Sequence, residues 1–282
     1  MELELTDQRW RDLRGAVAGA SARFARLVAD CRRPDARAVG DWSVAETAAH
    51  TAVVARLNAG LVAADPSPLG VPDLDAGWRE ASFGDFARLN SSSIRHFPYR
   101  DGESVGRDLV ERVDVLLARS ADLDPREPRT WLGGARLPVA TILAHQLNEV
   151  LLHGFDVARA LGEPWSIPPE EAALAFDLFL MRLIGGDTGN LVGGGAHRGR
   201  RVLIEFRSAH TTPVLVEEGD GRVVVTAPDR TADATVRFEP ATLLLRIFRR
   251  TSLLAALASR EVSVSGPRPW AALTYLRRTR TP

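Results

Sequence analysis

The sequence has no lysine and only one cysteine. All 36 basic residues are arginine, which excludes a Schiff-base lysine and the lysine of a phosphate-binding P-loop. The single thiol, Cys31, excludes an internal disulfide and a cluster of thiolate ligands. No base is patterned beside Cys31 to activate it, so we expect this residue to be dispensable.

Signals for nucleic acid and for membranes are also missing. The arginines are balanced by 36 acidic residues, and no basic stretch carries interleaved aromatic residues, which argues against nucleic-acid binding. No apolar run reaches the roughly 18 residues that span a bilayer. The first residues are amphipathic and include Glu2, Glu4 and Asp7, unlike a signal peptide. We therefore expect a cytoplasmic protein, either a monomer or a homodimer.

Helical periodicity dominates the first half of the chain. Ser43 and Glu46 form a capping box that starts one of the helices, and Gly162 followed by Pro164 ends another. Helices are predicted over residues 6–30, 44–63, 79–97, 103–120 and 138–162, with loops at 64–78 and 122–137. Helices with such short connections predict a four-helix bundle over residues 1–165.

The pattern changes after residue 165. A helix at 169–184 precedes short β-branched runs bounded by turn residues, which are typical of antiparallel strands. Strands are predicted at 202–206, 214–217, 222–226, 234–238 and 261–265, and helices at 240–259 and 268–279. The second half, residues 166–282, therefore predicts a smaller domain with a mainly antiparallel sheet, and the fold class of the whole chain is α+β.

The helix at 138–162 carries a polar stripe on an otherwise apolar surface. His145, Glu149 and His153 are spaced four residues apart, so they share one helix face. Burying two imidazoles and a carboxylate is costly unless a partner compensates them, and a divalent metal would do so. A facing helix of the bundle should complete the ligand set, and the helix at 44–63 has one histidine, His50. We predict that His50, Glu149 and His153 bind the metal.

Two histidines and one carboxylate are typical of catalytic zinc sites and of several non-haem iron sites. We expect Zn²⁺, with Ni²⁺ or Fe²⁺ as alternatives. Asp156 follows His153 by three residues and either orients its imidazole or is a surface charge. His145 either lines the cavity or points to solvent. Both are candidate catalytic residues, whereas His96, His197 and His210 have no patterned partner.

The segments Asp41–His50 and Glu149–Asp156 together resemble the mycothiol-dependent maleylpyruvate isomerase family, a branch of the DinB-like metalloenzymes. The matching positions are Trp42, His50, Glu149, His153 and Asp156. The segment Ala232–Leu244 resembles the sterol-carrier-like domain often fused behind this bundle. There Arg249-Arg250-Thr251 replaces the family's glycine-arginine step, so the pocket of that domain differs in detail.

A catalytic metal with an open position can bind a thiol and lower its pKa. The chain offers no suitable cysteine, so the thiol would come from a low-molecular-weight cofactor, which the resemblance implies is mycothiol. The other partner would be a small electrophile. Arginines bind carboxylates through two hydrogen bonds, which makes Arg237 and Arg246 candidate cofactor-binding residues in a site that the second domain completes.

Three functions remain open on these residues. The first is a metal- and mycothiol-dependent isomerase or S-transferase, in which the thiol adds to the electrophile and then either leaves or stays. The second is a metal hydrolase with His145 or Asp156 as general base. The third is a carrier protein with a structural metal, although structural zinc sites usually have four ligands and favour cysteine.

Overall fold

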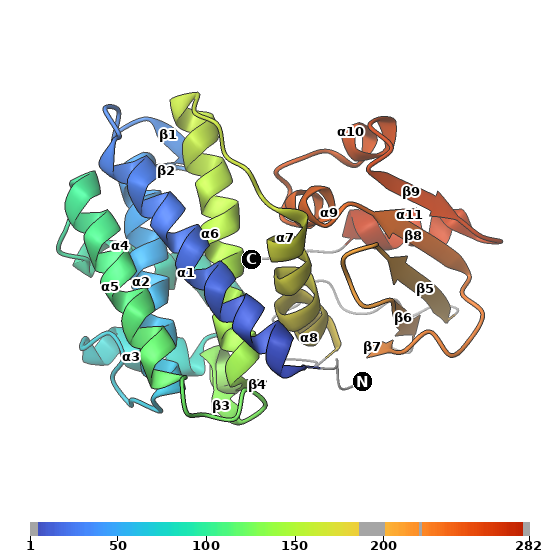
Figure 1. Ribbon diagram of the computed structural model, residues 1–282, viewed down its shortest axis with the longest axis horizontal. Helices are drawn as coiled ribbons and strands as arrows, with labels where there is room; N and C mark the ends of the chain where they lie inside the picture. Colours follow the sequence, from blue (N-terminus) through green and yellow to red (C-terminus); the bar gives the residue numbers. More distant parts are fainter. Residues whose placement is uncertain (1–4, 186–200, 220–221, 279–282) are drawn as a thin grey trace. The chain divides into compact units, whose positions relative to one another are not determined.

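The computed structural model describes residues 5–185, 201–219 and 222–278. The chain divides between Ile167 and Pro168 into two compact units, drawn in Figure 1. One is helical and the other contains a five-stranded sheet. The predicted α+β fold class with an N-terminal helical bundle is confirmed.

Four long helices form the bundle of the first unit. Helices α1 and α2 each pack against both α5 and α6, and Figure 1 shows the four running side by side. Their bounds are Asp7–Ala29 for α1, Val44–Val62 for α2, Gly102–Arg119 for α5 and Val139–Leu161 for α6. Each lies within two residues of a predicted helix, because strong apolar periodicity marks all four.

Local chemistry fixes the ends of these helices. The Ser43 hydroxyl accepts a hydrogen bond from the Glu46 amide, and the Glu46 carboxylate accepts one from the Ser43 amide, so the predicted capping box starts α2. Gly162 ends α6 with a left-handed φ of 78°, a conformation that glycine adopts without strain.

Shorter elements fill the connections, and three predictions were wrong there. The segment 122–137, predicted as a loop, contains most of a β-hairpin. The segment 64–78, predicted as a loop, contains most of α3, Pro72–Glu80, and the predicted helix at 79–97 is broken. It consists of the end of α3, a 3₁₀ turn at Phe83–Asp85 and α4, Phe86–His96. Two antiparallel hairpins complete the unit: β1, Arg37–Val39, with β2, Trp42–Ser43, and β3, Pro128–Thr130, with β4, Arg136–Pro138. A 3₁₀ turn at Leu132–Gly134 joins the second pair.

The second unit contains a sheet with the strand order β7-β6-β5-β8-β9. Its pairs are antiparallel except for β5 with β8. The strands are β5, Val202–Arg207; β6, Val214–Gly219; β7, Arg222–Thr226; β8, Ala234–Phe238; and β9, Val262–Ser265. All five strands were predicted, because short β-branched runs bounded by turn residues mark them in the sequence.

Helices α7, Pro169–Ala175, and α8, Met181–Gly185, flank a π-helical turn at Phe176–Leu180. The predicted helix at 240–259 is interrupted: α9, Pro240–Ile247, ends before Arg249, whose φ is 62°, and Ser252 caps α10, Leu253–Ala258. Helix α11 spans Pro269–Arg278. Across the described residues, no helix combines the length and apolar character needed to cross a bilayer.

Candidate metal centre

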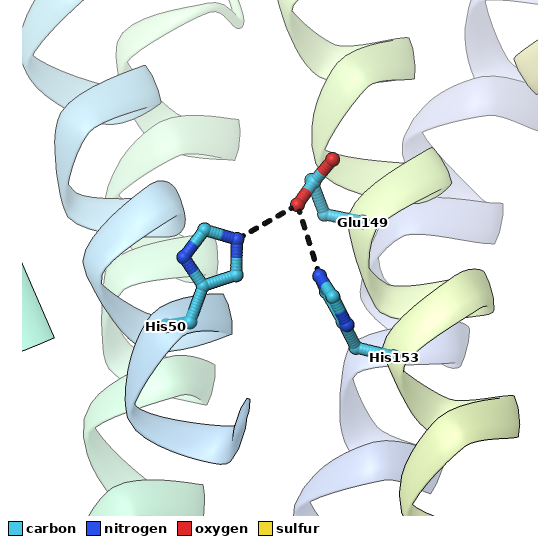
Figure 2. A group of neighbouring side chains, drawn as sticks. All are labelled: His50, Glu149 and His153. Atoms are coloured by element: carbon cyan, nitrogen blue, oxygen red, sulfur yellow. Dashed lines mark hydrogen bonds and ion pairs between the residues drawn. The ribbon is translucent and has the colours of Figure 1, made fainter. Parts of the chain in front are cut away.

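Side chains from α2 and α6 converge on one point in the bundle. Figure 2 shows the Glu149 carboxylate between the imidazoles of His50 and His153. Oε2 of Glu149 lies 3.1 Å from Nε2 of His50 and 3.4 Å from Nε2 of His153. One ligand atom from each residue lies within 4.8 Å of the others. These are the three residues predicted as metal ligands, and the fold brings them together.

His145 lies one turn earlier on α6 and is buried, so it does not point to solvent. Its Nε2 is 3.6 Å from Oε1 of Glu149, the carboxylate oxygen that faces away from the other two histidines. Its Nδ1 donates a hydrogen bond of 3.2 Å to the amide oxygen of Asn58. The Asn58 amide nitrogen in turn donates to Gln146 over 3.1 Å. This network fixes both the ring orientation and the proton position of His145.

Asp156 is completely buried, which excludes the interpretation as a surface charge. Its Oδ2 accepts a 3.2 Å hydrogen bond from Nδ1 of His153, and its Oδ1 lies 3.7 Å from the Arg159 guanidinium. A proton held on Nδ1 leaves the Nε2 lone pair of His153 directed at the cluster. Carboxylates commonly orient metal-binding histidines in this way.

Indole rings cover the cluster. Trp42 lies just before α2 and its ring is 4.9 Å from that of His50 and 6.4 Å from that of His153, centroid to centroid. Trp131, in the connection between β3 and β4, packs edge-on against His145 at 5.1 Å. These apolar walls lower the local dielectric, which strengthens each electrostatic interaction inside.

Burial and the neighbouring groups shift the pKa values of the cluster. Burial alone would raise the pKa of Glu149, but hydrogen bonds with His145, His153 and His50 hold it well below its usual value. Burial lowers the pKa of His50 despite its hydrogen bond to Glu149. Burial also acts to lower the pKa of His153, but hydrogen bonds to Asp156 and Glu149 raise it overall. Glu149 is therefore ionised and His50 is neutral near pH 7, as ligands must be.

The donor set fits a divalent cation. Glu149 and Asp156 place two carboxylates in the bundle interior, and the partly exposed Arg159 lies 3.7 Å from Asp156. Two imidazoles and a carboxylate leave coordination positions open, although His153 must first lose the proton that its raised pKa favours. The two histidines differ in the hydrogen bonding of their Nδ1 atoms. Nδ1 of His50 is buried without a hydrogen-bond partner among the described residues, whereas Nδ1 of His153 has Asp156.

The predicted cofactor-binding arginines lie in the second unit. Arg237, on β8, donates a hydrogen bond from Nη1 to Ser265 over 3.4 Å. Arg246, on α9, donates from Nη2 to the carbonyl of Leu276, and burial lowers its pKa. Their role in cofactor binding stays a prediction.

The remaining candidates behave as expected from their lack of patterned partners. Cys31 has a free thiol. His96 is exposed and hydrogen-bonds the Ser92 carbonyl, and His210 lies 3.6 Å from the exposed Glu170. His197 lies outside the described residues.

Sequence reasoning missed Asn58, Gln146 and Trp131, which surround His145. A signal existed for Asn58, because it is one of few polar residues on a helix rich in alanine and valine. Trp131 gave no signal, since it lies in a segment predicted only as a loop and reaches His145 through the tertiary fold.

The sequence matches the family model described as the mycothiol maleylpyruvate isomerase N-terminal domain over residues 15–158, just over half of the chain. The chain belongs to the mycothiol maleylpyruvate isomerase family. The matched segment contains all three predicted metal ligands and Asp156, so the predicted family is confirmed.

Two solved structures with similar folds are the mycothiol-dependent maleylpyruvate isomerase and a histidine-to-alanine variant of it. Each is 14% identical to this family member, and the match covers 92% of both chains, with TM-scores of 0.51 and 0.52, respectively. At that identity the likeness shows a shared two-domain fold. A comparison with curated protein sequences returns no match.

Proposed function

We propose that the protein is a metal-dependent enzyme that uses mycothiol as a thiol cosubstrate and acts on a small electrophile, as an isomerase or S-transferase similar to maleylpyruvate isomerase. One observation carries this proposal: ligand atoms of His50, Glu149 and His153 lie within 4.8 Å of one another in the interior of a bundle whose sequence matches this family.

His50, Glu149 and His153 would hold the ion, for which we favour Zn²⁺ over Ni²⁺ or Fe²⁺. A bound divalent ion supplies a Lewis acid that lowers the pKa of a thiol in its open position. Glu149 contributes the negative charge that fixes a cation there, and Asp156 directs the imidazole of His153 toward it.

His145 is the proposed proton acceptor. The hydrogen bond to Asn58 holds a proton on Nδ1 of His145, so Nε2 of His145 is the basic atom. This Nε2 lies 3.6 Å from Oε1 of Glu149. Cysteine catalysis by the chain itself is not part of this scheme, because the β1–β2 hairpin separates Cys31 from α2 in the sequence. A thiol from solution would take that role.

The test is a comparison of purified variants for metal content and for turnover of maleylpyruvate with mycothiol. Glu149→Gln keeps the shape of the side chain but removes its charge, so bound metal should be lost. Turnover should fall by at least about a hundredfold, ~2.7 kcal/mol of barrier. Cys31→Ser is the matched control and should retain both properties.

Metal retained by a folded Glu149→Gln variant at the wild-type level would show that the ligand assignment is wrong. Turnover of ester or amide substrates by the metal-loaded protein without mycothiol would instead favour a hydrolase. Chelation separates the enzyme from a carrier with a structural metal, because removing a structural ion should unfold the bundle.

The arginines of the second unit provide a separate prediction. If Arg237 and Arg246 bind the carboxylates of cofactor or substrate, Arg237→Gln and Arg246→Gln should raise KM by about tenfold each, the loss of one charge-assisted hydrogen bond. Metal content should not change. An unaltered KM in both variants would remove these residues from the binding site.

A further inference from the structure

The helical unit contains a cavity of about 490 Å³ that none of the proposed metal ligands lines. It lies between the C-terminal end of α2, helix α3 and the β3–β4 hairpin, which Figure 1 places at the same end of the bundle. Leu57 and Leu61 of α2 form one wall. Its size falls in the range of roughly 300–1,000 Å³ that is usual for small-molecule sites.

Two tryptophans give this cavity flat apolar walls. Trp78 on α3 is buried, donates a 3.1 Å hydrogen bond to Ser93 and packs edge-on against Phe86. Trp131 also lines the cavity, and its ring packs against the ring of His145. Both indoles are therefore fixed in position, and a planar apolar molecule could pack on them with little loss of side-chain freedom.

The polar part of the lining includes hydrogen-bond donors for an anion. Three guanidinium groups, of Arg79, Arg129 and Arg136, border the cavity. Arg79 donates to the Pro66 carbonyl and Arg136 to the Pro128 carbonyl and the Thr130 hydroxyl. In the described part of the chain, neither pairs with a carboxylate. Arg129 has only 17% of its side chain exposed.

Three carboxylates, of Asp65, Asp75 and Glu127, line the same cavity and balance the three guanidinium charges in number. Asp75 is buried and uses both oxygens on the Ser67 hydroxyl and the amides of Leu69 and Val71. Glu127 pairs with Nη1 of Arg129. The Nε of Arg129 donates to the Val62 carbonyl over 2.9 Å, and its Nη2 has no hydrogen-bond partner among the described residues.

We propose that this cavity binds an amphipathic organic anion, with a planar apolar group against Trp78 and Trp131 and a carboxylate or similar group on Arg129. The unused Nη2 of Arg129 provides the donor, and Arg79 and Arg136, which pair with no carboxylate among the described residues, line the same cavity. The proposal goes beyond the metal chemistry and does not depend on a bound ion or on mycothiol. Trp131 lines the cavity and also packs against His145. An occupant would therefore be separated from the His145 side of the proposed metal centre by the Trp131 ring.

The test uses two ligands of the same shape, 1-naphthoate and 1-naphthylmethanol, titrated calorimetrically into the full-length protein. The anion should bind with one site per chain and at least about tenfold more tightly than the alcohol, the factor expected from one charge-assisted hydrogen bond. Absence of naphthoate binding, or equal affinities for the two ligands, would overturn the proposal.

Two variants separate the parts of the site. Arg129→Gln should reduce the affinity for naphthoate to that for the alcohol and leave the affinity for the alcohol unchanged. The variant leaves Glu127 without its partner, but 42% of the Glu127 side chain is exposed, so its carboxylate remains solvated. Leu61→Trp fills the cavity and should weaken both ligands. Arg107→Gln, an exposed residue paired with Glu103 on α5, is the control. If Arg129→Gln retains the preference for the anion, or folded Leu61→Trp binds both ligands normally, the site is elsewhere.

Discussion

The two units of this protein bury different kinds of core. In the second unit, the rings of Phe176, Phe206, Phe238 and Tyr275 pack with centroid distances between 4.9 and 6.3 Å. In the helical unit, the corresponding interior position holds three histidines and two carboxylates. An aromatic core gains stability from every ring that it buries, whereas buried ionisable groups cost free energy unless they are paired.

This difference supports the proposed metal site in the bundle. A bundle could fold more stably with apolar residues at His50, Glu149 and His153, because replacing buried ion pairs by well-packed apolar groups is often neutral or stabilising. The polar residues of the bundle are therefore better explained by ligand binding than by stability. The following variants test whether the two cores behave as differently as their compositions imply.

The largest effect is expected in the aromatic core. Phe206→Ala removes a fully buried ring and should cost about 3–5 kcal/mol of unfolding free energy, measured by denaturant unfolding. The metal content should stay at the wild-type level, since none of the proposed metal ligands lies in that unit. Val224→Ala, at an exposed position on β7, should change neither quantity. Metal loss in a folded Phe206→Ala protein would show that the two cores are not independent.

An intermediate effect is expected beside the proposed metal centre. Asp156→Asn preserves a hydrogen-bond acceptor for His153 but removes the charge, and loss of such an orienting carboxylate typically weakens metal binding by roughly 10–100-fold. A competition titration with a metal-binding dye measures the change. Asp114→Asn, exposed on α5, is the matched control. Unchanged affinity in Asp156→Asn would mean that Asp156 serves the fold alone.

The smallest effect concerns a buried carboxylate outside the metal centre. Burial raises the pKa of Asp108 on α5, and the Arg112 guanidinium 3.5 Å away only partly opposes this. The folded state thus binds the proton more tightly than the unfolded state, and the stability from this group is lost as pH rises through the folded pKa. At pH 7, Asp108→Asn should therefore stabilise the protein, by less than about 1 kcal/mol after allowance for solvent screening.

The gain should shrink as the pH is lowered toward 4, because Asp108 then becomes neutral in the wild-type protein too. Thermal unfolding at both pH values, with Asp114→Asn as the reference, measures it. A stabilisation that is equal at both pH values would assign the effect to packing rather than to charge.

The parts of the fold that follow from periodicity were predictable. The four bundle helices repeat an apolar pattern at helical spacing, and the five strands are short β-branched runs bounded by turn residues. The stripe of His145, Glu149 and His153 follows from the same geometry, and His50 follows from the need for a facing partner. The stripe depends only on residue spacing within one helix, and His50 is the one histidine on the facing helix.

Other features depend on contacts that spacing does not encode. Helix α3 begins at Pro72 inside a segment rich in proline and aspartate, and it is stabilised by Asp75 binding the loop before it. The break between α9 and α10 requires a left-handed Arg249, which no local signal predicts, since arginine rarely adopts that conformation. The contact of Trp131 with His145 arises only when the hairpin folds onto the bundle.

The position of Trp42 should make its fluorescence sensitive to an ion bound at the proposed metal centre. Its indole lies 4.9 Å from the ring of His50, so an open-shell ion such as Ni²⁺ bound by that imidazole lies within quenching distance of the excited indole, whereas Zn²⁺, with a filled d shell, lacks the electronic states for the same quenching. The difference in emission between the wild-type protein and Trp42→Phe isolates this one ring from the other five tryptophans. Native fluorescence can therefore distinguish an open-shell ion from Zn²⁺ in a given preparation, without labelling the protein.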